Sequence, residues 1–191
     1  MLIKDWKKEI WTIPNLLSLF RLILIPVYIT IYSHANKDSD YYLAAMILAV
    51  SCLTDLIDGK IARRFNMIST IGKILDPLAD KLTQFALILC LTARYSILWY
   101  LVVLFVVKES FQLVAGGINL KRGRMLKGAL LSGKVCTTVL FVSLIIMVML
   151  PELKYNQILT IFVIDMAFML LSFGNYLFTY FKNESQFQKL D

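Results

Sequence analysis

The sequence contains few charged residues and few cysteines. Only 17% of its 191 residues are charged and 59% are hydrophobic, whereas an average soluble domain is ~45–50% apolar and ~25% charged. The three cysteines, Cys52, Cys90 and Cys136, are an odd and widely spaced set, which offers neither a disulfide framework nor a C-x-x-C metal site. The composition therefore excludes an ordinary soluble domain and a fold held together by disulfides.

The chain instead contains six long apolar stretches separated by polar or charged turns. Each is close to the ~20 residues that a membrane-spanning helix needs. We therefore expect an all-α integral membrane protein that forms one domain over residues 1–191, with a six-helix bundle over 13–180 and a tail over 181–191. The six stretches are residues 13–33, 41–63, 70–93, 96–119, 128–150 and 156–180.

The distribution of basic residues predicts how these helices cross the membrane. Three of the 20 basic residues fall on one side, namely Lys37, Arg94 and Lys154, and the other 17 fall on the opposite side or in the helices leading to it. By the positive-inside rule, both termini and the 17-residue side are cytoplasmic, in the cell (inner) membrane. Residues 1–11, which alternate lysines with apolar side chains, are expected to form an amphipathic helix in the membrane interface.

Four aspartates lie within the second and third stretches, where a carboxylate at the helix centre costs ~2.5–3.5 kcal/mol on insertion scales. Asp55 and Asp58 are three residues apart and Asp76 and Asp80 are four apart, so each pair shares one helix face. A hairpin turning near Asn66 brings Asp55 and Asp76 to the same depth. Four clustered carboxylates repel one another unless hard divalent cations such as Mg²⁺ or Mn²⁺ bind them.

Small residues accompany the aspartates. Gly59, Ala62 and Gly72 leave room for a ligand against the helix backbone, and Arg63 has a guanidinium that can fork onto phosphate oxygens. Together they predict a site for a substrate linked through phosphate. The alternative is that lysines on the same helices neutralise the aspartates as ion pairs, which leaves the small residues unexplained; these lysines are Lys60, Lys73 and Lys81.

The whole segment resembles a known family signature. It reads D-L-I-D-G-K-I-A-R over 55–63 and, after eight residues, G-K-I-L-D-P-L-A-D over 72–80. It resembles the signature of the CDP-alcohol phosphotransferases, D-x-x-D-G-x-x-A-R-x8-G-x3-D-x3-D, at every fixed position. The resemblance implies that the four aspartates hold two divalent ions, that Asp80 is also the general base, and that Gly59, Ala62, Arg63 and Gly72 receive the CDP moiety.

Within that family, residues 13–26 and 75–82 look most like phosphatidylglycerophosphate synthases and the related CDP-diacylglycerol-type cardiolipin synthases. The resemblance implies transfer of a phosphatidyl group from CDP-diacylglycerol to sn-glycerol 3-phosphate, with release of CMP, by a homodimer. Lys134 matches a basic residue that lies near the acceptor phosphate in this family, whereas Lys108 stands where these synthases usually have Arg. The candidates for binding the acceptor phosphate are Lys134, Lys108, Arg122 and Arg124.

Other functions remain open at this stage. The acceptor can be phosphatidylglycerol, as in a cardiolipin synthase, or less readily serine or inositol. A cation channel or transporter would use the carboxylates as its ion site, but helices two and three are apolar toward the far side of the membrane. The net charge of +7 is interpreted as a topology signal and as attraction for anionic lipid and CDP, with no role for nucleic acid.

Two further charged residues lie inside the stretches. Arg21 either lines the site or extends to the membrane interface. Asp165 has no acidic neighbour, and we expect it to hydrogen-bond to another helix.

Overall fold

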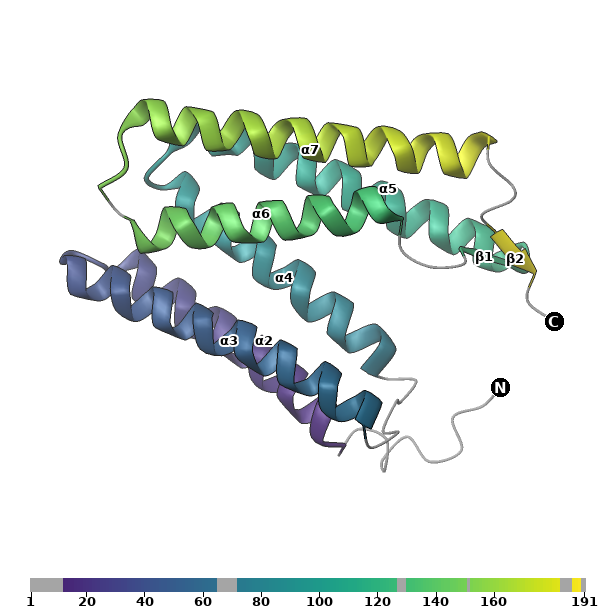
Figure 1. Cartoon of the computed structure of the whole chain (residues 1–191), viewed down its shortest axis with the longest axis horizontal. Helices are drawn as coiled ribbons and strands as arrows, with labels where there is room; N and C mark the ends of the chain where they lie inside the picture. Colours follow the sequence, from purple (N-terminus) through teal and green to yellow (C-terminus); the bar gives the residue numbers. More distant parts are fainter. Residues whose placement is uncertain (1–11, 65–71, 127–129, 151, 183–186, 190–191) are drawn as a thin grey trace. The chain divides into compact units, whose positions relative to one another are not determined.

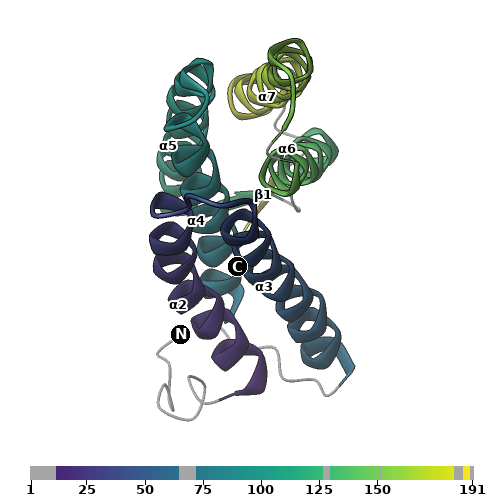
Figure 2. The same cartoon turned by 90° about the vertical axis from the view of Figure 1, so that its left-hand side faces the viewer.

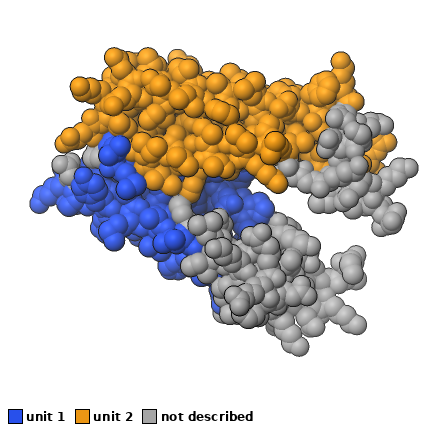
Figure 3. Space-filling model, in the orientation of Figure 1, with its two compact units in different colours: residues 1–91, 148–151 blue, residues 92–147, 152–191 orange. Residues whose placement is uncertain are grey.

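The computed structural model divides the chain into two compact units (Figure 3), each described here by itself. Unit 1 comprises Met1–Leu91 and Val148–Pro151, and unit 2 comprises Thr92–Met147 and Glu152–Asp191. The residues whose structure is described are 12–64, 72–126, 130–150, 152–182 and 187–189.

Long helices make up most of the described chain, as the apolar stretches predicted (Figures 1 and 2). Among the described residues, four helical segments are long and apolar enough to cross a membrane: Asn15–Ser33, Ser96–Lys121, Leu131–Met149 and Tyr155–Lys182. The predicted interfacial helix over residues 1–11 lies outside the described residues. The long helices are α2 (Ile13–Ser33), α3 (Asp38–Arg64), α4 (Gly72–Thr92), α5 (Trp99–Lys121), α6 (Leu131–Met149) and α7 (Tyr155–Lys182), and a 3-10 turn, η1 (Ser96–Leu98), precedes α5.

The all-α prediction needs one small correction. Two three-residue strands, β1 (Arg124–Leu126) and β2 (Phe187–Lys189), pair antiparallel, with Met125 opposite Gln188. They lie where the sequence predicted a polar or charged turn and a tail. Gly123, with φ of 68°, ends α5 in the left-handed conformation that glycine adopts without strain, and this redirects the chain into β1.

Unit 1 is built on the close pairing of α2 and α3. Ala44 and Ala45 of α3 are buried, and small side chains let membrane helices approach closely. Tyr32 of α2 stacks on Tyr28, with ring centroids 5.7 Å apart, and meets Tyr41 of α3 edge-on at 5.5 Å. This aromatic cluster fixes one end of the pair, so the polar residues of α2 are held in register with their neighbours.

Unit 2 is held together by aromatic contacts between α5 and α7. The ring of Phe111 lies 5.6 Å from that of Phe173 and 5.8 Å from that of Tyr180, both edge-on. Tyr180 also contacts Phe187 of β2 at 5.6 Å. The strand pair is thereby attached to the end of α7.

Asp165 of α7 forms the expected bond to another helix. The Ser143 hydroxyl of α6 donates to Asp165 Oδ2 at 2.6 Å, and both residues are buried. This interhelical hydrogen bond gives the isolated carboxyl a structural role within unit 2.

Asp165→Leu is therefore expected to destabilise the protein in detergent by about 0.6 kcal/mol, the average for an interhelical hydrogen bond in a membrane protein, and by no more than ~1.7 kcal/mol. Asp165→Asn keeps an acceptor at the same place and should lose less. Thermal unfolding of both variants measures the difference. Ser143→Ala added to Asp165→Leu should cost little more, because the bond is already gone; full additivity would contradict the pairing.

Candidate active site

A buried polar face runs along the first half of α2. Asn15, Ser18 and Arg21 follow one another at three-residue spacing and are only 1%, 0% and 2% exposed. Residues three apart lie on the same side of a helix. Since α2 is otherwise apolar, three buried polar residues on one face require polar partners on a neighbouring helix.

For Ser18 and Arg21, those partners are the two aspartates of α4. The Ser18 hydroxyl donates to Asp76 Oδ1, and Arg21 Nη1 donates to Asp80 Oδ1 in an ion pair. Asp76 and Asp80 are one helical turn apart, as the motif spacing predicted, and the polar face of α2 matches them in spacing. Two of the four predicted carboxylates are thus held by side chains from a second helix.

The ion pair is asymmetric in its exposure. The Arg21 side chain is 2% exposed, whereas that of Asp80 is 43% exposed. The guanidinium therefore supports the carboxylate from the protein interior while the carboxylate also faces outward. A charge-assisted hydrogen bond of this kind fixes the orientation of the acid and leaves it accessible to a ligand from outside.

The role of Arg21 was left open by the sequence. The structure shows that Arg21 is buried beside Asp80 rather than extended to the interface. The sequence argument missed Ser18 as a part of the site, although its three-residue spacing with Arg21 in an apolar helix was a usable signal. The alternative from the sequence was that lysines on the same helices neutralise the aspartates. In the structure, Asp80 forms an ion pair with Arg21 of α2.

The remaining motif residues are placed only by their helices. Asp55 and Asp58 lie in α3, followed by Gly59, Ala62 and Arg63, and α4 begins at Gly72. The side chains of these residues are outside the described part of the chain. The four-carboxylate cluster and the ligand space beside it therefore stay predictions.

The donor set on α4 suits a hard divalent cation. Asp76 and Asp80 present carboxylate oxygens one turn apart on a common face, and both are partly exposed. Oxygen ligands of this type bind Mg²⁺ or Mn²⁺. Ser18 and Arg21 hold the two carboxylates in place, in the way that outer hydrogen bonds orient metal ligands.

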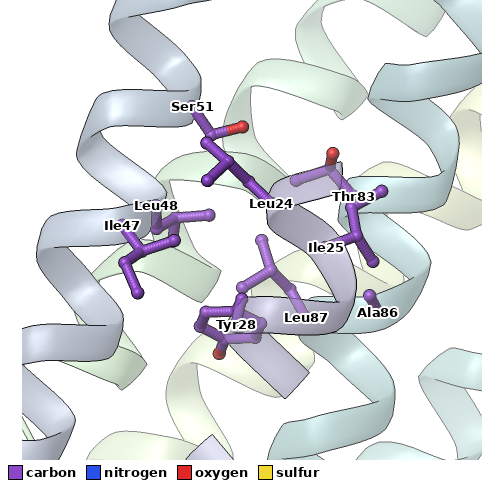
Figure 4. A pocket seen from close by; sticks show the side chains of 9 residues that line it. All are labelled: Leu24, Ile25, Tyr28, Ile47, Leu48, Ser51, Thr83, Ala86 and Leu87. Carbon is purple, nitrogen blue, oxygen red and sulfur yellow. The ribbon is translucent and has the colours of Figure 1, made fainter. Parts of the chain in front are cut away.

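Deeper in unit 1, a small cavity lies among α2, α3 and α4 (Figure 4). Its volume is about 10 Å³, and its lining is apolar apart from a few hydroxyls, among them Ser51 and Thr83. That volume is roughly what one water molecule needs. The Thr83 hydroxyl is already engaged with the carbonyl oxygen of Ala79 at 2.8 Å. The cavity is too small to admit a substrate group or to act as an ion path.

The acceptor-site candidates belong to unit 2. Lys134 is exposed and is the fourth residue of α6, which begins at Leu131 rather than at the expected residue 128. It therefore lies close to the helix start instead of seven residues into a span. Lys108 is buried, and its Nζ lies 2.6 Å from Glu109 Oε1. Arg122 is exposed just after α5, and Arg124 lies in β1.

Arg21→Gln is expected to lower the rate of the predicted phosphatidyl transfer about tenfold or more. The reason is that hydrogen bonds to charged groups contribute ~1.5–3 kcal/mol, and glutamine cannot hold the carboxylate by charge. Arg21→Lys keeps the charge but not the fork and should retain part of the activity. The matched control is Arg94→Gln, at an exposed position, which should behave like the parent; equal rates for Arg21→Gln and Arg94→Gln would refute a role for Arg21.

The chain is similar in sequence to known proteins. The family model described as CDP-alcohol phosphatidyltransferase matches residues 11–173. A cardiolipin synthase (CMP-forming) of Streptomyces coelicolor is 36% identical over 118 residues, which cover 60% of this chain and 54% of that protein. A probable cardiolipin synthase (CMP-forming) of Drosophila melanogaster is 36% identical over 115 residues, covering 60% and 34%.

A third relative carries a different name. The CDP-diacylglycerol–glycerol-3-phosphate 3-phosphatidyltransferase of Escherichia coli is 37% identical over 89 residues, which cover 47% of this chain and 48% of that protein. The chain thus spans about half the length of the Streptomyces and Escherichia relatives and about a third of the Drosophila one. The names of these relatives thus denote two different enzymes.

Proposed function

Since the chain belongs to the CDP-alcohol phosphatidyltransferase family, we propose that it transfers a phosphatidyl group from CDP-diacylglycerol to sn-glycerol 3-phosphate. The products are phosphatidylglycerophosphate and CMP. The observation that carries this proposal is the pairing of Asp76 and Asp80 with Ser18 and Arg21, because it organises the last two acids of the motif for chemistry. The 37% identical Escherichia coli relative supports this choice of acceptor.

The family generally depends on divalent metal ions. In this chain, the carboxylates of Asp55, Asp58, Asp76 and Asp80 are proposed to hold two such ions, Mg²⁺ or Mn²⁺. When bound, these ions supply neutralisation of the charge that develops on the diphosphate. The hydrogen bond from Ser18 supports this role for Asp76, because it orients a ligand carboxylate.

Asp80 is proposed to accept the proton of the acceptor hydroxyl. A general base must be within hydrogen-bond reach of that proton, and the 43% exposure of the Asp80 side chain is compatible with such an approach. The oxygen of the primary hydroxyl then forms a bond to the β-phosphorus of CDP-diacylglycerol, and the bond to CMP breaks. Arg21 keeps the carboxylate oriented throughout.

The other motif residues are proposed to receive the CDP group. Gly59, Ala62 and Gly72 lack bulky side chains, so a nucleotide diphosphate can approach the helix backbone. Arg63 is proposed to contact phosphate oxygens through its guanidinium. These assignments rest on the match to the family signature.

The chain is a membrane protein. We propose that α3 and α4 also cross the bilayer, giving six spans in the cell (inner) membrane, with the aspartates on the cytoplasmic side. CMP and glycerol 3-phosphate are charged and soluble, so this side supplies and receives them. The excess of basic residues on that side supports the orientation.

A second candidate is a CMP-forming cardiolipin synthase that uses phosphatidylglycerol as acceptor. Two relatives carry that name, and their matched segments cover 60% of this chain, against 47% for the glycerol-3-phosphate enzyme. The transfer chemistry at the aspartates would be the same, and only the acceptor differs.

Release of CMP tests the proposed reaction. Purified protein in mixed micelles with CDP-diacylglycerol and Mg²⁺ should form CMP only after glycerol 3-phosphate is added, with one CMP for each lipid product. CMP formation at the same rate without any acceptor would instead indicate hydrolysis and would contradict phosphatidyl transfer to glycerol 3-phosphate.

Lys134 is proposed to bind the acceptor phosphate. Lys134→Gln should raise the KM for glycerol 3-phosphate about tenfold, the effect of losing ~1.4 kcal/mol of binding, and change kcat little, because a lost ground-state contact acts on KM. Lys154→Gln, at another exposed lysine, is the matched control. A KM unchanged by Lys134→Gln would remove Lys134 from the acceptor site.

A further inference from the structure

A groove of about 580 Å³ lies between the first turns of α6 and the second half of α7, within unit 2. Its α6 side is formed by Leu131, Ser132 and Val135, and its α7 side includes Phe168, Ser172 and Phe178. The volume falls in the ~300–1,000 Å³ range of ligand sites. Nothing in the proposed reaction uses this groove.

The groove lies along two candidate membrane spans, α6 and α7. The apolar side chains at its rim are exposed, with Leu131 at 78%, Leu171 at 67% and Phe178 at 57%. In a membrane helix, exposed apolar side chains contact lipid. An occupant of this groove therefore enters from the lipid phase.

Two hydroxyl groups at the base of the groove point to the kind of occupant. Ser132 Oγ and Ser172 Oγ are buried, and neither forms a hydrogen bond within the described part of the chain. Ser172 itself is 0% exposed. Leaving a hydroxyl unsatisfied in an apolar setting costs about 1–3 kcal/mol, so an occupant with hydrogen-bond acceptors is favoured over a purely apolar one.

A positive charge lies at one end of the groove. Lys182 Nζ lies 6.0 Å from the centroid of the Phe178 ring, and that ring lines the groove. At a rise of ~1.5 Å per residue, Lys182 lies about 15 Å along α7 from Ser172. The groove thus offers, in order, a cation, hydroxyl donors and an apolar channel toward Phe168.

The packing of α6 on α7 holds Ser132 at a fixed position along the groove. A Cβ at Gly133 would lie 2.6 Å from Tyr176 Oη, so only glycine permits this approach, and the Tyr176 hydroxyl also hydrogen-bonds to the backbone of Leu130. The start of α6 is thereby fixed against the last third of α7, and Ser132 is held between the levels of Ser172 and Lys182.

We propose that this groove binds one anionic diacyl phospholipid. Its phosphate lies at Lys182, its ester carbonyls accept hydrogen bonds from Ser132 and Ser172, and one acyl chain runs along Phe168 and Leu171. This order of cation, donor and apolar surface matches the order of phosphate, ester and chain in a phospholipid. A helix of another protein would leave both hydroxyls and the charge without complementary groups. The proposal rests on the membrane embedding proposed above and not on the reaction.

Two valine variants of α6 test the groove. Val135→Trp fills it, whereas Val142→Trp adds the same bulk two turns further on, at another exposed position outside the lining. Delipidated protein in detergent, without divalent metal so that the aspartates do not recruit phosphate, is titrated with dioleoyl-phosphatidylglycerol. Native mass spectrometry then counts the bound lipid.

The parent and Val142→Trp should each bind one lipid tightly, and Val135→Trp should bind it at least tenfold more weakly. Ser172→Ala should weaken binding several-fold without filling the groove, and Lys182→Gln should reduce the preference over dioleoyl-phosphatidylcholine. Equal binding by Val135→Trp and Val142→Trp would overturn the proposal. Binding in the absence of metal does not depend on turnover, so its failure is distinguishable from failure of the proposed reaction.

Discussion

Asp80→Asn is expected to form product at least ~10²-fold more slowly than the parent, the usual scale for loss of a general base. Asparagine has nearly the same size and still accepts a hydrogen bond from Arg21, so the geometry of α2 and α4 is kept. It cannot take a proton from the acceptor hydroxyl. Binding of CDP-diacylglycerol should persist, although the loss of one metal-ligating charge weakens it.

The rate is measured as lipid product formed by purified variants at saturating substrates, and donor binding is measured separately by equilibrium titration. Asp165→Asn is the matched control, because it replaces another aspartate inside a helix whose role is the bond to Ser143. That control should turn over like the parent. Near-normal turnover by Asp80→Asn would refute its assignment as the base.

Removal of divalent metal is expected to have an effect of similar or larger size. Metal ions contribute several kcal/mol to stabilising charge on a transferring phosphoryl group, and each ~1.4 kcal/mol changes the rate tenfold. Chelation should therefore lower turnover at least ~10³-fold, and added Mg²⁺ or Mn²⁺ should restore it. Full activity after exhaustive chelation would contradict a metal-dependent transfer.

A variant of one proposed metal ligand tests whether the loss of activity on chelation arises at the aspartates. Asp76→Asn should raise the Mg²⁺ concentration for half-maximal rate about tenfold, because one charged oxygen ligand is lost, worth ~1.4 kcal/mol of affinity. The Mg²⁺ dependence of Asp165→Asn should match the parent. If Asp76→Asn had an unchanged Mg²⁺ dependence, Asp76 would not be a ligand.

Most of the helical fold was predictable from the sequence, because the membrane sets the length of an apolar helix. The stretch predicted over 13–33 is α2 at Ile13–Ser33, and the one predicted over 156–180 is α7 at Tyr155–Lys182. Polar turns interrupt the apolar runs clearly. The pairing of β1 with β2 was not predictable, because three-residue strands some sixty residues apart carry no periodic signal.

The aspartates of the candidate site were predictable from the sequence, whereas the residues that hydrogen-bond to them were not. The spacing of Asp76 and Asp80 placed them on one face of a helix, and a hydrogen bond between Asp165 and a second helix was also expected. The partners Ser18 and Arg21 lie nearly sixty residues earlier in the chain, and only the packing of α2 beside α4 brings them together. The groove in unit 2 likewise depends on how far α6 and α7 stand apart, which no local pattern encodes.

The central claim is that this chain transfers phosphatidyl groups from CDP-diacylglycerol to glycerol 3-phosphate, and the mass of the lipid product tests it most directly. Pure protein is given CDP-diacylglycerol and Mg²⁺ together with glycerol 3-phosphate or phosphatidylglycerol in parallel reactions. We predict phosphatidylglycerophosphate in the first and little product in the second. Cardiolipin from phosphatidylglycerol, with no phosphatidylglycerophosphate from glycerol 3-phosphate, would contradict the claim and establish the second candidate instead.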